Sequence, residues 1–190
     1  MFRPRSLPEL RTNRLCIKLL DPQRADIMVK FRLENRDYLK PWEPRRTPEF
    51  FTEPFWQLQL RYSMNEFREG HSVCLVLLNL AEEEVLGVCN YTNIVRGTFQ
   101  ACHLGYALAE RHQGKGLMFE ALEASNRYIF EEMGLNRIMA NYLPHNERSG
   151  RLLARLGFRI EGKAEKFLKI DGRWEDHVLT SRLNPAARYD

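Results

Sequence analysis

The spacing of apolar positions in the first part of the chain predicts one strand followed by two helices. Residues 12–20 alternate apolar and polar side chains, which is typical of a strand. Asp21-Pro22 supplies a helix N-cap and a first-turn proline, so we expect a helix that runs to about residue 38. Closely spaced prolines then predict a rigid loop over residues 40–47. A second helix is expected up to Gly70, with an apolar stripe formed by Phe55, Leu58, Tyr62 and Phe67.

The middle of the chain changes to the period of strands and then returns to that of a helix. Three consecutive strands are predicted over residues 72–80, 85–95 and 99–108, with short turns between them. A long helix follows over residues 117–133. Its expected buried stripe comprises Met118, Leu122, Ser125, Ile129 and Met133.

The last part of the chain combines both kinds of element. We predict a strand over residues 137–143, a short helix over residues 146–156, and two strands over residues 159–170 and 174–183. Asp171-Gly172 forms the hairpin turn between these two strands. Taken in order, the elements predict an α/β (α+β) fold in which a mixed sheet carries helices on both faces.

Composition and charge narrow the class of protein. The 190 residues show no repeat and no linker, so we expect a single domain over residues 1–190, with a core of about residues 10–185. Hydrophobic residues make up 44% of the chain, which is enough for a core. The net charge of +4 is too mild and too dispersed to indicate binding to DNA or another nucleic acid. It suits a small polyanionic ligand, such as a cofactor that contains a nucleotide.

The cysteines and the N-terminus point to a cytoplasmic protein. The four cysteines lie far apart in strand-like segments without a paired spacing, so we expect buried free thiols rather than a zinc or redox site. The five histidines show no metal-ligand spacing either. The first six residues lack an apolar signal core, and no apolar run is long enough to cross a bilayer. We therefore expect neither a metal nor a membrane partner.

Residues 111–117 form a candidate phosphate-binding loop between a strand and the long helix. Two glycines let the backbone approach a ligand, and the amides at a helix N-terminus favour a phosphate. Lys115 adds a positive charge, although a solvated lysine is equally typical here. The spacing excludes a Walker loop, because Leu117 replaces its hydroxyl residue, and a dinucleotide fingerprint, because Phe119 replaces its third glycine. A plain strand–helix turn would show the same short glycine pattern.

Several stretches along nearly the whole chain carry a family resemblance. The first set is Leu104-Gly105-Tyr106-Ala107-Leu108, Gln113-Gly114-Lys115-Gly116-Leu117-Met118, Asn146-Glu147-Arg148-Ser149 and Leu156-Gly157-Phe158. The second set is Asn35, Leu39 to Pro44, Val95-Arg96-Gly97, Met139 to Tyr142, and Asp171-Gly172 with Trp174, Asp176 and His177. The first set resembles the GCN5-related N-acetyltransferases, and the second resembles their subgroup of ribosomal-protein alanine N-acetyltransferases. The resemblance implies a mostly antiparallel, twisted sheet and acetyl-CoA as cosubstrate without a metal.

The same resemblance implies where the cofactor would bind. The pyrophosphate motif of the family fits residues 111–116 at every position and residues 113–118 except at the last, and the spacing from the preceding strand favours the second register. The expected loop residues are Gln113, Gly114, Lys115, Gly116, Leu117 and Met118. The pantetheine arm would pair with the main chain of Tyr106, Ala107 and Leu108 as an added strand. Gly105 would mark the bulge that separates this strand from residues 137–143.

The resemblance also assigns roles near the thioester to three residues, and each residue also has a purely structural alternative. Asn146 would contact the cofactor, and it is equally suited to cap a helix. Ser149 would act as the acid toward the leaving thiolate, although a serine in the first helical turn is common. Tyr142 would form a hydrogen bond near the thiol or simply pack.

No general base is carried over from the relatives. Glutamates proposed as bases in two related ribosomal acetyltransferases align with Asn141 and Leu168, and an acid tyrosine aligns with Leu153. An α-amine has a pKa near 7.7–8.0, so roughly one molecule in seven is neutral at pH 7. A lysine amine is neutral in only about one molecule of several thousand. A weak base therefore suffices for an α-amine. Glu43, in the proline-rich loop, is the carboxylate expected first, although a solvated glutamate is also typical there. His103 is a minor candidate.

The resemblance implies direct transfer, in a ternary complex, to the N-terminal alanine of the fifth protein of the small ribosomal subunit. Two alternatives remain: the same fold acetylating a small-molecule amine, and an assembly factor of the small subunit in which acetylation is secondary. The expected partners are the ribosomal protein N-terminus and the assembling small subunit, with the protein acting as a monomer or a homodimer.

Overall fold

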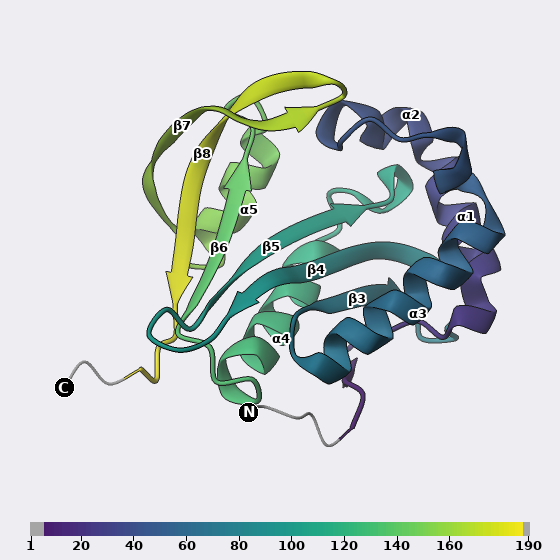
Figure 1. Ribbon diagram of the computed structural model, residues 1–190, viewed down its shortest axis with the longest axis horizontal. Helices are drawn as coiled ribbons and strands as arrows, with labels where there is room; N and C mark the ends of the chain where they lie inside the picture. Colours follow the sequence, from purple (N-terminus) through teal and green to yellow (C-terminus); the bar gives the residue numbers. More distant parts are fainter. Residues whose placement is uncertain (1–5, 188–190) are drawn as a thin grey trace.

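An eight-stranded sheet runs through the part of the chain that the computed structural model describes, residues 6–187 (Figure 1). The strands are β1 (Glu9–Arg11), β2 (Cys16–Lys18), β3 (Val73–Leu78), β4 (Val85–Val95), β5 (Ala101–Leu108), β6 (Arg137–Tyr142), β7 (Arg159–Ile170) and β8 (Arg173–Leu183). Their order in the sheet is β1-β2-β3-β4-β5-β6-β8-β7. Neighbouring strands are antiparallel except β5 and β6, which are parallel. The mixed, mostly antiparallel sheet is therefore confirmed. The first five residues, part of the N-terminal segment assessed for a signal core, lie outside the described residues.

Helices cover both faces of this sheet, as expected. They are α1 (Ala25–Glu34), α2 (Arg36–Leu39), α3 (Glu53–Glu69), α4 (Leu117–Glu131) and α5 (Glu147–Arg155), with 3-10 turns at Pro22–Arg24, Lys40–Trp42, Pro48–Phe51 and Glu110–His112. One core lies between the sheet and α4 and α5, and a second lies between the sheet and α1 and α3. In β3, Leu75 and Leu77 face the first core while Val76 and Leu78 face the second, because side chains alternate along a strand. We call these two sides of the sheet the α4 face and the α1 face.

The first helical segment differs from its prediction because it is interrupted at Asn35. The Asn35 amide Nδ2 donates to the Phe31 carbonyl at 2.8 Å, and its Oδ1 accepts from the Glu110 backbone N–H at 2.9 Å. This buried side chain therefore separates α1 from α2 and fastens both to the end of β5. The strand expected over residues 12–20 is also shorter, and β1 was not expected.

The buried stripe of α3 also differs from its prediction. Leu58 and Tyr62 are 65% and 57% exposed. Phe67 is buried as expected, but the other buried positions are Trp56, Leu60 and Ser63, and these four residues follow the helical period of 3.6 residues. By contrast, the stripe expected on α4 is buried throughout: Met118, Leu122, Ser125, Ile129 and Met133.

All four cysteines are free thiols, as expected. Cys16, Cys89 and Cys102 are buried, whereas Cys74 is only half-buried, so the expectation of burial was wrong for that residue. Within residues 6–187, no helix combines the length and the apolar character that a bilayer span requires.

The sheet is split in its middle, where β5 and β6 pair over only three residues each. Their last pair is His103 with Met139. Beyond it the two strands diverge, which leaves an opening in the sheet that we call the gap (Figure 1). The bulge expected at Gly105 lies elsewhere: Gly105 keeps its register opposite β4, and the register shifts in β4 near Asn93, whose φ is 52°. Asparagine adopts this backbone conformation more readily than most residues.

Candidate functional site

The gap opens into a cavity of about 1090 Å³ that has walls on both faces of the sheet. Tyr106 and Ser149 line it on the α4 face, and Trp42, His103 and His177 line it on the α1 face. The β7–β8 hairpin arches over the gap and reaches the segment around α2 (Figure 1). The cavity therefore crosses the sheet and can be reached by different molecules from its two faces.

The β5 backbone turns hydrogen-bonding groups toward the gap beyond its last pair with β6. The Ala109 N–H donates to the Leu86 carbonyl at 2.8 Å, which fixes the pairing phase between β4 and β5. Because hydrogen bonds alternate along an antiparallel pair, the main-chain groups of Tyr106 and Leu108, which lie beyond the last β5–β6 pair, are directed away from β4 and into the gap. They are the groups with which an added strand could pair.

Two of the three β5 residues expected to bind the pantetheine arm thus offer main-chain groups. Ala107 is directed toward β4 by the same alternation, and it lines the cavity with its side chain. The Leu108 carbonyl already accepts a hydrogen bond from Gln113 Nε2 at 2.9 Å. Gln113 Oε1 in turn accepts from Arg148 at 3.3 Å, and Arg148 also donates to the Tyr38 hydroxyl at 3.1 Å. The Gln113 side chain therefore joins β5 to α5 and α2 beside the gap.

The predicted phosphate loop has the backbone that its glycines permit. Gly114 and Gly116 have φ angles of 72° and 74°, a conformation that glycine adopts without strain. Helix α4 begins at Leu117 and has no side-chain cap, so the amides of its first turn lack an intrahelical acceptor and lie at the positive end of the helix dipole. A Cβ added at Gly114 would meet no atom within 4 Å. The loop therefore leaves room and free donors for an anion.

Arg14 fixes this loop, a role that sequence reasoning missed. It donates to the Lys115 carbonyl at 2.8 Å, and it pairs with Glu120 of α4 at 2.6 Å. The second contact neutralises a carboxylate that would otherwise oppose an anion at the helix N-terminus. The Lys115 ammonium donates to the Arg111 carbonyl at 2.9 Å, so it too lies against the loop.

The position of Arg111 favours the second register of the phosphate motif. Its guanidinium pairs with Glu84 at 2.6 Å and with Glu34 at 3.3 Å. Gln113 and Met118 line the cavity, whereas Arg111 does not; of the other predicted loop residues, Gly114, Lys115, Gly116 and Leu117 also lie outside its lining. We therefore keep residues 113–118 as the prediction for the anion-binding segment.

A pair of hydroxyl groups lies on the α4 face of the gap. The Tyr106 hydroxyl and Ser149 Oγ are 2.6 Å apart, and either can donate. Burial raises the pKa of Tyr106 to about 12, against the opposing effect of the hydrogen bond from Ser149. Asn146 holds Ser149 in place, because its Oδ1 caps α5 by accepting from the Ser149 N–H at 3.2 Å. The sequence predicted only a main-chain contact for Tyr106, so the contact of its side-chain hydroxyl with Ser149 was not expected.

Tyr142 lies next to this pair and packs beneath α5. A Cβ added at Gly150 would lie 2.9 Å from two Tyr142 ring carbons. The contact requires glycine at that position, and the ring also lines the cavity. The packing role foreseen for Tyr142 is therefore present in the structure, and a contact with a ligand thiol stays a prediction.

Glu43 lies on the α1 face, where arginines engage both of its carboxylate oxygens. Oε1 accepts from the buried Arg32 at 2.9 Å, and Oε2 accepts from Arg46 at 3.2 Å. The Arg32 guanidinium also lies 5.1 Å from the centre of the Trp56 ring. The Glu43 carbonyl accepts from the Asp171 N–H at 2.9 Å, which joins the loop to the tip of the β7–β8 hairpin. These contacts favour a positioning role for Glu43, and its expected role as a base stays a prediction.

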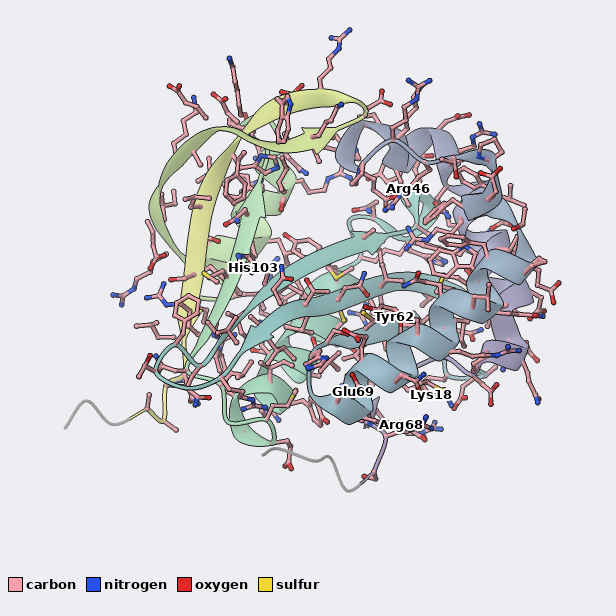
Figure 2. All side chains as sticks on the ribbon, viewed as in Figure 1. Lys18, Arg46, Tyr62, Arg68, Glu69 and His103 are labelled. Carbon is pink, nitrogen blue, oxygen red and sulfur yellow. The ribbon has the colours of Figure 1, made fainter. Side chains whose placement is uncertain are left out.

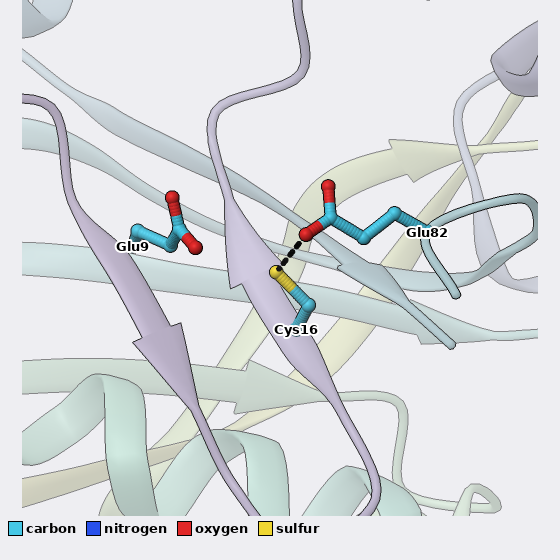
Figure 3. A group of neighbouring side chains, drawn as sticks. All are labelled: Glu9, Cys16 and Glu82. Atoms are coloured by element: carbon cyan, nitrogen blue, oxygen red, sulfur yellow. Dashed lines mark hydrogen bonds between the residues drawn. The ribbon is translucent and has the colours of Figure 1, made fainter. Parts of the chain in front are cut away.

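Two acidic side chains, Glu9 and Glu82, also lie near Cys16, outside the cavity lining (Figure 3). The Cys16 thiol donates to Glu82 Oε1 at 3.4 Å, and Glu9 lies beside it. The Glu82 carboxylate is already paired with Arg11 at 2.8 Å and with the Lys18 ammonium. Because these cations take the place that a metal would occupy, the cluster is an ion-pair network that ties β1 and β2 to the β3–β4 turn.

Comparisons with known proteins agree with this geometry. The family described as acetyltransferase (GNAT) domain matches residues 14–159. The chain is 48% identical over 189 residues to the [ribosomal protein uS5]-alanine N-acetyltransferase of Escherichia coli, covering 97% of each. The crystal structure of ribosomal-protein-S5-alanine acetyltransferase from Vibrio fischeri superimposes with a TM-score of 0.91 at 36% identity, covering 95% of this chain and 99% of the other. For Mycobacterium smegmatis RimJ in complex with CoA-disulfide, the TM-score is 0.84 at 26% identity, covering 93% and 86%.

Proposed function

This chain belongs to the GNAT acetyltransferase family, and from that premise we propose that it acetylates the N-terminal alanine of ribosomal protein uS5. Acetyl-CoA is the acetyl donor, and transfer is direct within a ternary complex. The observation that carries the proposal is the 48% identity, over 97% of both chains, to the E. coli enzyme named for this reaction. The substrate class implies that the reaction takes place in the cytoplasm.

The α4 face of the gap suits the donor. Free amides at the start of α4, next to Gly114 and Gly116, suit the pyrophosphate, and the free edge of β5 suits an extended arm. When bound, acetyl-CoA supplies an activated acetyl thioester whose sulfur is the leaving group. Asn146 keeps the Ser149 hydroxyl beside the gap by capping α5.

The hydroxyl pair provides a proton for the leaving sulfur. Ser149 Oγ donates it, while the Tyr106 hydroxyl donates in turn to Ser149 Oγ across their 2.6 Å contact. Because the pKa of Tyr106 is raised to about 12, this hydroxyl keeps its proton throughout the neutral range. We therefore assign Ser149 as the acid and Tyr106 as the residue that orients it.

The α1 face receives the protein N-terminus. An α-amine is partly neutral at pH 7, so the acceptor can attack without a strong base. The loop held by Arg32 and Glu43 forms one wall of this entrance, and the β7–β8 hairpin forms another. A chain end that enters here meets the donor from the opposite face of the sheet.

The test is acetylation of a peptide with the N-terminal sequence of uS5, followed by mass spectrometry. We expect one acetyl group on the alanine amine. A matched peptide with a blocked N-terminus and a free lysine should stay unmodified, as should a panel of polyamines and aminoglycosides. No transfer to the alanine peptide at high enzyme concentration, or faster transfer to an amine of the panel, would overturn the proposal.

A further inference from the structure

His103 lies at the point where the sheet splits (Figure 2). It is the last β5 residue that pairs with β6, opposite Met139, and it lines the cavity. Its neighbours Cys102 and Leu104 belong to the core on the α4 face. Because side chains alternate along a strand, the His103 imidazole projects from the α1 face, on the opposite side from Ser149.

The imidazole has a ring nitrogen without a partner. Nδ1 of His103 is buried and has no hydrogen-bond partner within residues 6–187. Burial alone lowers the pKa of His103, so the ring is mostly neutral near pH 7. Titratable or charged groups of other elements also line the cavity on this face: Arg32, Glu43, Arg46, His145, Lys169 and His177. None of them contributes to the shift, and no carboxylate holds the ring.

The direction of β5 relates His103 to the reacting atoms of the proposed transfer. An added strand that starts at the N-terminus of α4 and pairs with β5 runs from Leu108 toward Leu104. That distance is about 13 Å at roughly 3.3 Å per residue. Its far end therefore lies beside the last β5–β6 pair, with the hydroxyls of Tyr106 and Ser149 on one face of the sheet and His103 on the other.

We propose, on the basis of the acetyl transfer described above, that His103 accepts the proton that the attacking α-amine releases. The amine nitrogen forms a bond to the acetyl carbon while the bond from that carbon to sulfur breaks, and its electron pair goes to sulfur. The sulfur takes a proton from the Ser149 hydroxyl, and the amine nitrogen gives one to the neutral imidazole. One proton leaves the nitrogen and one reaches the sulfur, so the exchange balances, and solvent resets both side chains.

A buried, neutral imidazole suits an α-amine better than a lysine. It is too weak a base to remove the proton of a resting lysine ammonium, whose pKa is near 10.4. An α-amine that is already partly neutral needs a proton acceptor only once it has attacked. His103 thereby favours an α-amine over a lysine amine by its basicity. This preference acts together with the shape of the cavity, which admits a chain end.

The test measures kcat for the His103→Ala variant with an alanine peptide and its rescue by added imidazoles. We expect a loss of about 100-fold, with coenzyme A affinity unchanged because His103 lies on the other face of the sheet. Imidazole should restore activity better than 4-bromoimidazole, which is larger but less basic. Filling of a hole would instead favour the larger compound. The control is His71→Ala, which changes an exposed histidine next to Glu69 and should keep full activity.

His103→Gln provides a second measurement that does not depend on how the smaller variant packs. It retains a polar side chain but cannot take up a proton, so we expect a similar loss of kcat. The rise of kcat with pH below about 6.5, through the pKa of the imidazole, should also disappear. The inference is overturned if His103→Gln keeps at least half of the wild-type kcat, if its pH profile matches the wild type, or if bromoimidazole rescues better. Absence of transfer by the wild-type protein would instead contradict the proposed function.

Discussion

The hydrogen bond between Tyr106 and Ser149 allows a quantitative test of which hydroxyl donates the proton and which one orients the donor. Tyr106→Phe removes one hydroxyl and keeps the ring. The bond is 2.6 Å long and partly buried, and such a bond contributes about 0.5–1.5 kcal/mol. If it orients Ser149 during transfer, kcat should fall about 2- to 13-fold, since 1.36 kcal/mol corresponds to a factor of ten. With a tyrosine pKa of about 12, the loss should be equal at every pH in the neutral range.

Ser149→Ala removes the proposed proton donor itself, and kcat should fall about 100-fold or more. Because Tyr106 acts through Ser149, the double variant should be no slower than Ser149→Ala alone. The assay is kcat from mass spectrometry of the alanine peptide at saturating acetyl-CoA, with thermal melting of each variant. Tyr128→Phe is the matched control, since burial raises the pKa of that tyrosine also to about 12 but it does not line the cavity.

Three results would refute the reasoning. If the losses of the single variants multiply in the double variant, the hydroxyls act independently. If Tyr106→Phe is slower than Ser149→Ala, the tyrosine is the donor and the serine orients it. An unchanged kcat in Tyr106→Phe would show that the hydrogen bond has no part in the reaction.

Three further predictions concern stability and cofactor affinity. Gly116→Ala places a side chain at a φ of 74°, so urea denaturation should show a loss of about 1–2 kcal/mol together with a higher KM for acetyl-CoA; unchanged stability would contradict this. Glu43→Leu leaves the buried Arg32 without its carboxylate and should cost about 3–5 kcal/mol of stability. Arg46→Met removes the more exposed of the two arginines on that carboxylate and should cost about 1 kcal/mol or less. Equal losses in the two variants would exclude the buried charge as the cause. Burial raises the pKa of Cys89 to about 12. Above the usual pKa of a thiol, the native state therefore keeps a proton that the unfolded chain loses. Cys89 should therefore contribute about 1.4 kcal/mol per pH unit above pH 9 to the fall of the free energy of unfolding, and a Cys89→Ala variant that shows the wild-type slope would contradict the assignment.

The features that could be predicted from the sequence are those that depend on local spacing. The glycines at 114 and 116 indicated a loop at the start of a helix, and both have the positive φ that such a loop needs. Alternating apolar residues likewise placed the central strands within a few residues of their observed bounds. In both cases the physical cause lies within a few consecutive residues.

Contacts between residues far apart in the sequence could not be predicted, because no local pattern indicates which distant side chains meet. Tyr106 and Ser149 are 43 positions apart, and no local pattern shows that their hydroxyls meet. Arg14 acts on a loop about 100 residues later. Asn35 looks like an ordinary helical residue until Glu110 binds its side chain, and only then does the interruption between α1 and α2 have a cause. Such contacts depend on how β5 and β6 diverge, which the sequence does not reveal.

The contact between Asp171 and Glu43 completes a closed circuit of chain around the gap. The circuit passes from β5 through Asn35 and α2 to Glu43, crosses to the hairpin tip, and returns through β8 and β6. A polypeptide can be threaded through such a ring by its end, whereas an internal segment would have to pass as a doubled loop. The ring therefore favours a chain end over an internal segment, which agrees with the N-terminal acceptor proposed above.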